Sequence, residues 1–199
     1  LFSWLSGGSG RAGQLLEVYA DECFAHAAAP GALSPEQRRE NLSAFVASIE
    51  QRISRMQAFA AALGTALPTP DGDRDKVDAI GQTLDRFCKS QLCGVTTAEP
   101  ALAMDWQARE PQGPHRRIQT LTLDLGAYCG EIGIRCAPKY RWAIDEKRYT
   151  PATIMETSGR VVIGHDPAVI ATAMKNPVDA FAIAGFALQQ IVHYRKAKS

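Results

Sequence analysis

The sequence predicts an α+β fold: an N-terminal helical bundle, then a helix, a small antiparallel sheet of about three strands, and a C-terminal helix. Two observations predict it. Apolar residues recur three or four positions apart through the first half of the chain, which is the spacing of one helix face. Between residues 140 and 164 this spacing gives way to short segments rich in β-branched and aromatic residues. Helices and strands that follow one another in this way are typical of α+β proteins.

Residues 1–94 are expected to form the helical N-terminal region. A first helix covers residues 13–28 and stops before Pro30. A second helix begins after Ser34, which has the spacing of a capping box with Gln37. The polar turn between them is short, and short turns favour antiparallel packing of neighbouring helices.

The second helix is expected to run without a break from Pro35 to Leu63, with Gly64 at the position of a C-terminal glycine. Its opposite face carries several arginines, which we expect to face solvent. A third helix follows the break at residues 68–72, with Asp73 or Asp75 as its cap, and carries its apolar stripe to Leu92.

Residues 95–115 lose the helical period and contain several prolines, so they are expected to form a linker or a packed loop. Residues 116–199 form the α+β C-terminal region. It begins with a helix over residues 118–136 and ends with a helix that Asn176-Pro177 opens. Both a core shared with the N-terminal region and a separate domain fit this pattern. The strands between the two helices are expected at residues 140–144, 153–157 and 160–164, with a hairpin turn at Ser158-Gly159.

Composition excludes several classes of partner. The 22 basic and 21 acidic residues give a net charge of +1, whereas nucleic-acid-binding proteins usually carry a basic excess, so no nucleic acid is expected. No run reaches the roughly 18 apolar residues of a membrane span, so no membrane is expected either.

The five cysteines include no CxxC pair; we expect free thiols, no metal site and a cytoplasmic location.

The segment from Leu121 to Trp142 combines an apolar helical stripe with glycines, which disfavour a helix. Its three glycines each destabilise a helix by about 1 kcal/mol relative to alanine, so close packing at the glycine face is expected, with a bound ligand or partner as the alternative. Glu131 is expected to form an ion pair with Arg135 one turn away. If Glu131 is buried, its partner is instead Lys139 or Arg141, which would tie the helix to the first strand.

This segment also carries a resemblance. The run DLGAYCGE at residues 124–131, Trp142 on the following strand and Asn176-Pro177 before the last helix resemble a group of uncharacterised bacterial proteins with an LGxYxGE helix. The resemblance implies the arrangement of the C-terminal region and a bacterial source, and it fits proteins of the toxin-immunity type. It implies no catalytic activity.

Neither a GxSxG nucleophile motif nor a P-loop is present. We therefore expect a non-enzymatic bacterial interaction protein, an immunity protein that binds and neutralises a cognate toxin or secreted effector. The lack of a recognisable catalytic motif argues against an enzyme, and no cofactor is expected. The partner-binding surface should combine basic and aromatic side chains. Its candidates are Arg38, Arg52, Arg55, Trp106, Tyr140 and Tyr149.

The alternative is a small-molecule-binding protein or an enzyme that uses a cleft between the fourth helix and the sheet. Glu131, Arg141 and His165 would line that cleft and would have to lie within hydrogen-bond reach of one another. A third hypothesis, a structural subunit of a larger assembly, requires an extensive exposed apolar surface.

Overall fold

A computed structural model describes residues 11–20, 24–26, 32–87, 90–91, 114–136, 140–145, 150–156 and 161–163. This part of the chain is mostly helical. Its helices are α1 (Arg11–Glu17), α2 (Pro35–Ala47), α3 (Ile49–Ala62), α4 (Val77–Phe87) and α6 (Pro114–Cys136). Its strands are β1 (Tyr140–Asp145), β2 (Thr150–Glu156) and β3 (Val161–Ile163). Within these residues no helix is both long and apolar enough to cross a membrane.

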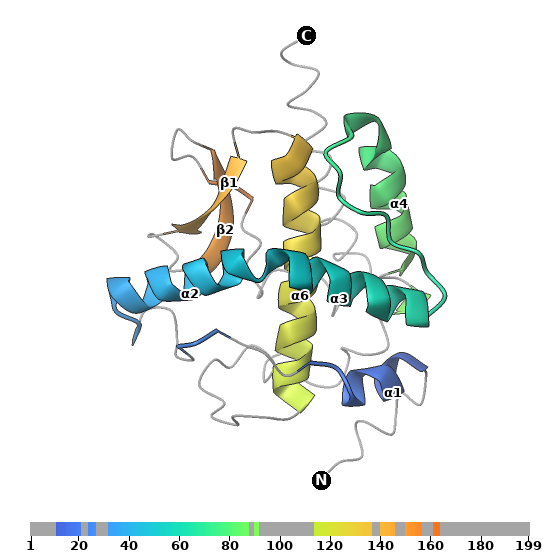
Figure 1. Ribbon diagram of the computed structural model, residues 1–199, viewed down its shortest axis with the longest axis horizontal. Helices are drawn as coiled ribbons and strands as arrows, with labels where there is room; N and C mark the ends of the chain where they lie inside the picture. The colour runs from blue at the N-terminus through green and yellow to red at the C-terminus, as the bar shows by residue number, and fades with distance from the viewer. Residues whose placement is uncertain are drawn as a thin grey trace.

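Helices α2 and α3 form one rod that crosses α6 (Figure 1). The predicted capping box is confirmed: the Ser34 side chain accepts from the backbone N–H of Gln37, and the Gln37 side chain accepts from the N–H of Ser34. The predicted C-terminal glycine is also confirmed, because Gly64 has φ +82°, a conformation that glycine adopts without strain.

The prediction of one unbroken helix is wrong at Ser48, where α2 ends and α3 begins. Ser48 has φ −97° and ψ 2°, outside the range of a regular helix. Its hydroxyl donates to the carbonyl of Phe45 at 2.9 Å and accepts from Nε of Arg52 at 2.8 Å. A serine that bonds back to the preceding turn commonly bends a helix, and here the bend changes what the rod contacts. Helix α2 contacts β1 and β2, whereas α3 contacts α6.

The first predicted helix is too long. Helix α1 ends at Glu17, whereas the prediction extended to residue 28. The N–H groups of Val18 and Tyr19 donate to the carbonyls of Leu15 and Leu16, which closes the helix with a tight turn. The side chain of Tyr19 is buried and bonds to α6 rather than continuing an apolar helix face.

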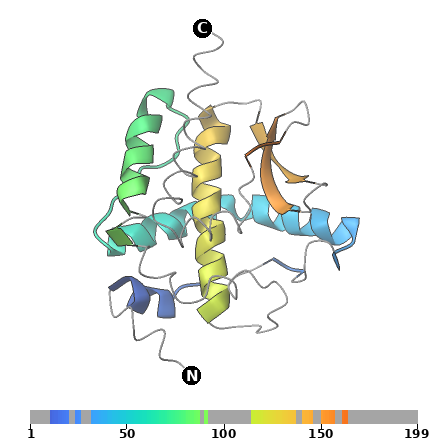
Figure 2. The ribbon, with the colours of Figure 1, turned by 180° about the vertical axis from the view of Figure 1, so that it is seen from behind.

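Helix α6 is the central element, and it lies between the strands and α4 in both views (Figures 1 and 2). Its described residues from Leu123 to Gly133 are all buried, glycines included. The hydrophobic core joins side chains of α1, α2, α3, α4 and α6, and Trp142 of β1 packs against it. A helix that is buried on every side tolerates little polar surface, so each polar residue in it must be bonded.

The strands pair antiparallel in the order β1-β2-β3. Tyr140 lies opposite Glu156 and Ala143 opposite Thr153, and the register shifts between Ala143 and Asp145. The predicted linker at residues 95–115 is wrong at its end, because α6 begins at Pro114. The rest of that linker, the turn at Ser158-Gly159 and the C-terminal helix lie outside the described residues.

Candidate functional site

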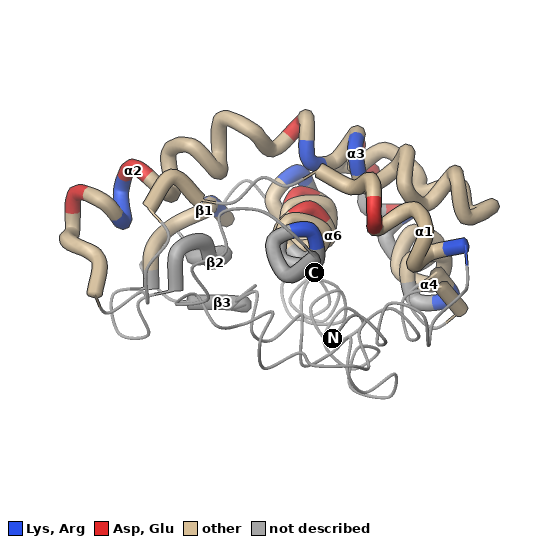
Figure 3. Tube along the Cα trace, turned by 90° about the horizontal axis from the view of Figure 1, so that it is seen from below, with Lys and Arg blue, Asp and Glu red and all other residues tan. Residues whose placement is uncertain are grey.

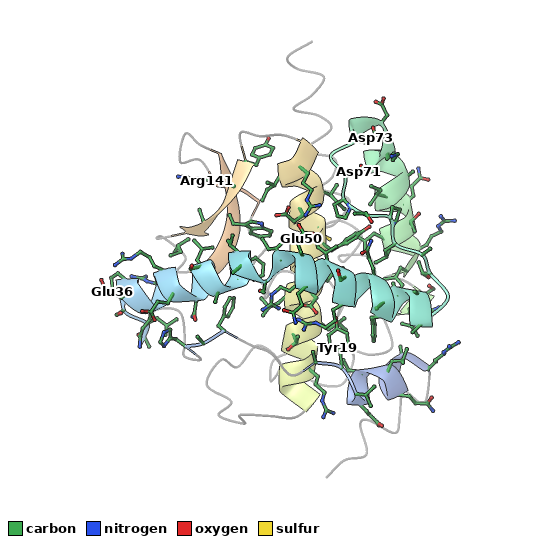
Figure 4. All side chains as sticks on the ribbon, in the orientation of Figure 1. Tyr19, Glu36, Glu50, Asp71, Asp73 and Arg141 are labelled. Carbon is green, nitrogen blue, oxygen red and sulfur yellow. The ribbon has the colours of Figure 1, made fainter. Side chains whose placement is uncertain are left out.

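Two polar clusters lie within and beside the helical core, and both are built on α6. The first, the Asp124 cluster, contains Tyr19, Arg52, Arg55 and Asp124. Arg52 and Arg55 are three residues apart on α3, so they share the helix face that crosses α6. Tyr19 reaches the same carboxylate from the turn after α1; Figure 4 labels it beside the lower half of α6.

Asp124 accepts four hydrogen bonds, two at each carboxylate oxygen. Oδ1 accepts from Nη1 of Arg52 at 2.9 Å and from Nη2 of Arg55 at 3.0 Å. Oδ2 accepts from the hydroxyl of Tyr19 at 2.8 Å and from Nε of Arg55 at 2.5 Å. The cluster therefore joins the turn after α1 to α3 and α6 through one side chain.

Burial sets the electrostatics of this cluster. Asp124 is fully buried, and the side chains of Arg52 and Arg55 are 5 % and 16 % exposed. Burial and the charge of Asp124 raise the pKa of Tyr19 well above its ordinary value, so its hydroxyl stays protonated and donates. Because both carboxylate oxygens are occupied by protein donors, Asp124 is a structural counter-charge.

The second, the Arg135 cluster, contains Glu50, Glu131, Arg135 and Trp142. Nε of Arg135 donates to Oε2 of Glu131 at 2.9 Å, which confirms the predicted ion pair one helical turn apart. Nη2 of Arg135 donates to Glu50 of α3. The indole Nε1 of Trp142 donates to the other oxygen of Glu131 at 2.8 Å, so this cluster ties β1 to α6 and α3.

The turn between α3 and α4 packs on the end of α6 through the same arginine. Nη1 of Arg135 donates to the carbonyl of Pro70 at 2.7 Å. Gly72 has φ +82°, and a Cβ at this position would lie 2.9 Å from the carbonyl oxygen of Arg135. Glycine is therefore required at position 72 both by the backbone angle and by the close approach of α6.

Asp71 and Asp73 in this turn hold the ammonium group of Lys76, at 2.8 Å and 3.2 Å. The hydrogen bond from Lys76 lowers the pKa of Asp71, and the backbone N–H of Asp75 together with Lys76 lowers that of Asp73. Figure 4 labels both aspartates at the α4 end of the molecule. Among the described residues, no group of three or more His, Cys, Asp or Glu side chains could hold a metal ion.

The arginines proposed for partner binding do not form an exposed face. Arg38 and Arg52 are buried, and Arg55 is bonded to Asp124 in the interior. The expected solvent-facing arginine surface is wrong because α3 turns Arg52 and Arg55 toward α6. The exposed charged residues of α2 and α3 are Glu36, Arg39, Glu40 and Glu50. Figure 3 shows where residues of both signs lie along the two helices. Tyr140 is also buried.

Trp106 and Tyr149, the other two partner-binding candidates, lie outside the described residues. So does His165 of the alternative cleft. Glu131 is buried against Arg135 and Trp142, whereas Arg141 is exposed. Trp142 faces α6, because its indole bonds to Glu131, and successive strand residues point to opposite faces, so Arg141 points away from α6. Figure 4 labels Arg141 on the strand. The structure therefore does not bring Glu131 and Arg141 together.

Sequence reasoning missed Asp124, which accepts hydrogen bonds from Tyr19, Arg52 and Arg55. One signal could have found it. Asp124 lies three residues after Leu121 and four before Tyr128, so it falls on the apolar stripe of α6. A carboxylate at such a position requires a buried cation, and Arg52 lies on the equally apolar stripe of Ile49 and Ile53.

Comparison of the chain with protein-family models, with curated proteins and with solved structures finds no match.

Proposed function

We propose that this chain is a non-enzymatic bacterial protein of the cytoplasm that binds another protein: an immunity protein that neutralises a cognate toxin or secreted effector. The observation that supports it most is that protein donors bind both buried carboxylates of the central helix α6. Asp124 and Glu131 are both buried, and both are held by arginine together with a tyrosine or tryptophan donor.

A catalytic acid or base must reach its substrate within hydrogen-bond distance. Each oxygen of Asp124 accepts from two protein donors, and each oxygen of Glu131 accepts from one. These bonds connect α6 with the turn after α1, with α3 and with β1. A binding protein needs such a rigid scaffold beneath its contact surface, since a preorganised surface loses less conformational freedom on association.

The resemblance of residues 124–131, Trp142 and Asn176-Pro177 to bacterial proteins with an LGxYxGE helix supports the same proposal. The proposal includes the full α+β arrangement with its C-terminal helix. It also includes a contact surface that does not use the buried Arg38 and Arg52, or Arg55, which is bonded to Asp124.

Isolation of a complex tests the proposal. The tagged chain is expressed in its own host and purified at moderate salt, and the eluate is analysed by light scattering and mass spectrometry. We expect a stoichiometric complex with one protein, and we expect co-expression of the chain to restore the growth of cells that produce this protein. Purification of the chain alone, together with a gene that lies far from any effector gene, would contradict the proposal.

The two exposed large hydrophobic side chains of the described part allow the surface to be mapped with matched variants. Val46 on α2 is 45 % exposed, and Val18 after α1 is 80 % exposed. V46D and V18D introduce the same charge at two separate places without opening the core. A variant on the contact face should weaken binding by about tenfold or more, equivalent to about 1.4 kcal/mol. The variant off that face serves as its control, and both should keep the melting temperature of the parent.

E131Q separates the proposal from the alternative of an enzyme. Under the proposal Glu131 acts only through the fold, so the variant should lose some stability and, below its melting temperature, retain the affinity of the parent for the partner. A hydrolytic or transfer activity of the parent chain that E131Q abolishes while the fold persists would favour the enzyme.

A further inference from the structure

We draw no further inference here: the strongest candidate, the exposed stripe of small side chains that Ala44, Ala47, Ser54, Ala58 and Ala61 form along the outer face of α2 and α3, carries none, because nothing in the structure shows what covers it.

Discussion

Replacement of Asp124 by asparagine would remove the counter-charge shared by two interior arginines. The side chain keeps its size, so the change tests charge and hydrogen bonding rather than packing. One oxygen can still accept from Arg52 and Arg55. The amide nitrogen that replaces the other oxygen would face Nε of Arg55, which is also a donor, so at least one buried donor would lose its acceptor.

The magnitude follows from burial. Two opposite charges about 4 Å apart attract by about 4 kcal/mol at the effective dielectric constant of a protein near its surface. Removal of one partner of a buried pair costs about 3–5 kcal/mol, because the other charge stays buried without compensation. Arg55 is 16 % exposed and can relax toward water, whereas Arg52 is 5 % exposed and cannot. We therefore expect D124N to lower the free energy of unfolding by about 4 kcal/mol.

Urea denaturation followed by far-UV circular dichroism measures this change. The control is E36Q, because Glu36 forms an ion pair with Arg39 at the exposed start of α2, and the midpoint of E36Q should stay close to that of the parent. A second arm replaces the whole cluster by apolar residues in Y19F/R52M/R55M/D124L, which also removes the Tyr19 hydroxyl that donates to Asp124 and should recover most of the stability lost in D124N. A loss below about 1 kcal/mol in D124N would refute the reasoning, since that is the range of a surface pair.

Three further outcomes are expected. G72A should destabilise the protein by more than G64A, because both residues have positive φ but only Gly72 faces a backbone oxygen of Arg135; thermal unfolding of the two variants decides it, and equal losses would contradict the close approach. The raised pKa of Tyr19 keeps its proton in the folded state while the unfolded chain loses it, so stability should be full below pH 10 and fall above it. Y19F should make this fall shallower in urea titrations at pH 9 to 11, and an unchanged slope would argue against it. S34A should lose about 1 kcal/mol of stability in the same denaturation assay, through its capping bond, and no loss would mean that water replaces the cap.

The parts of the fold that could be predicted depend on local sequence. The capping box at Ser34 and Gln37 involves residues three apart, and the ion pair of Glu131 with Arg135 involves one helical turn. Gly64 is likewise set by the requirement for positive φ where a helix ends. Each of these features needs only neighbours along the chain, so the residue pattern contains it.

The parts that could not be predicted depend on partners far away along the chain. Charges on a helix usually face water, so Arg52 and Arg55 were expected on the surface. Their counter-charge, Asp124, lies 72 and 69 residues further along the chain. The break at Ser48 could not be predicted for the same reason. The apolar period continues through Ser48, and only their different tertiary contacts distinguish α2 from α3.

The bend at Ser48 also has a consequence for how the protein opens. Helix α2 shares its contacts with β1 and β2, and α3 shares its contacts with α6. Groups of elements that pack together tend to exchange their amide hydrogens as one cooperative unit. We therefore expect Ser48 to be the point at which a local opening of the sheet side can stop, once Phe45 and the bond from Trp142 to Glu131, which join that side to the helical core, are released.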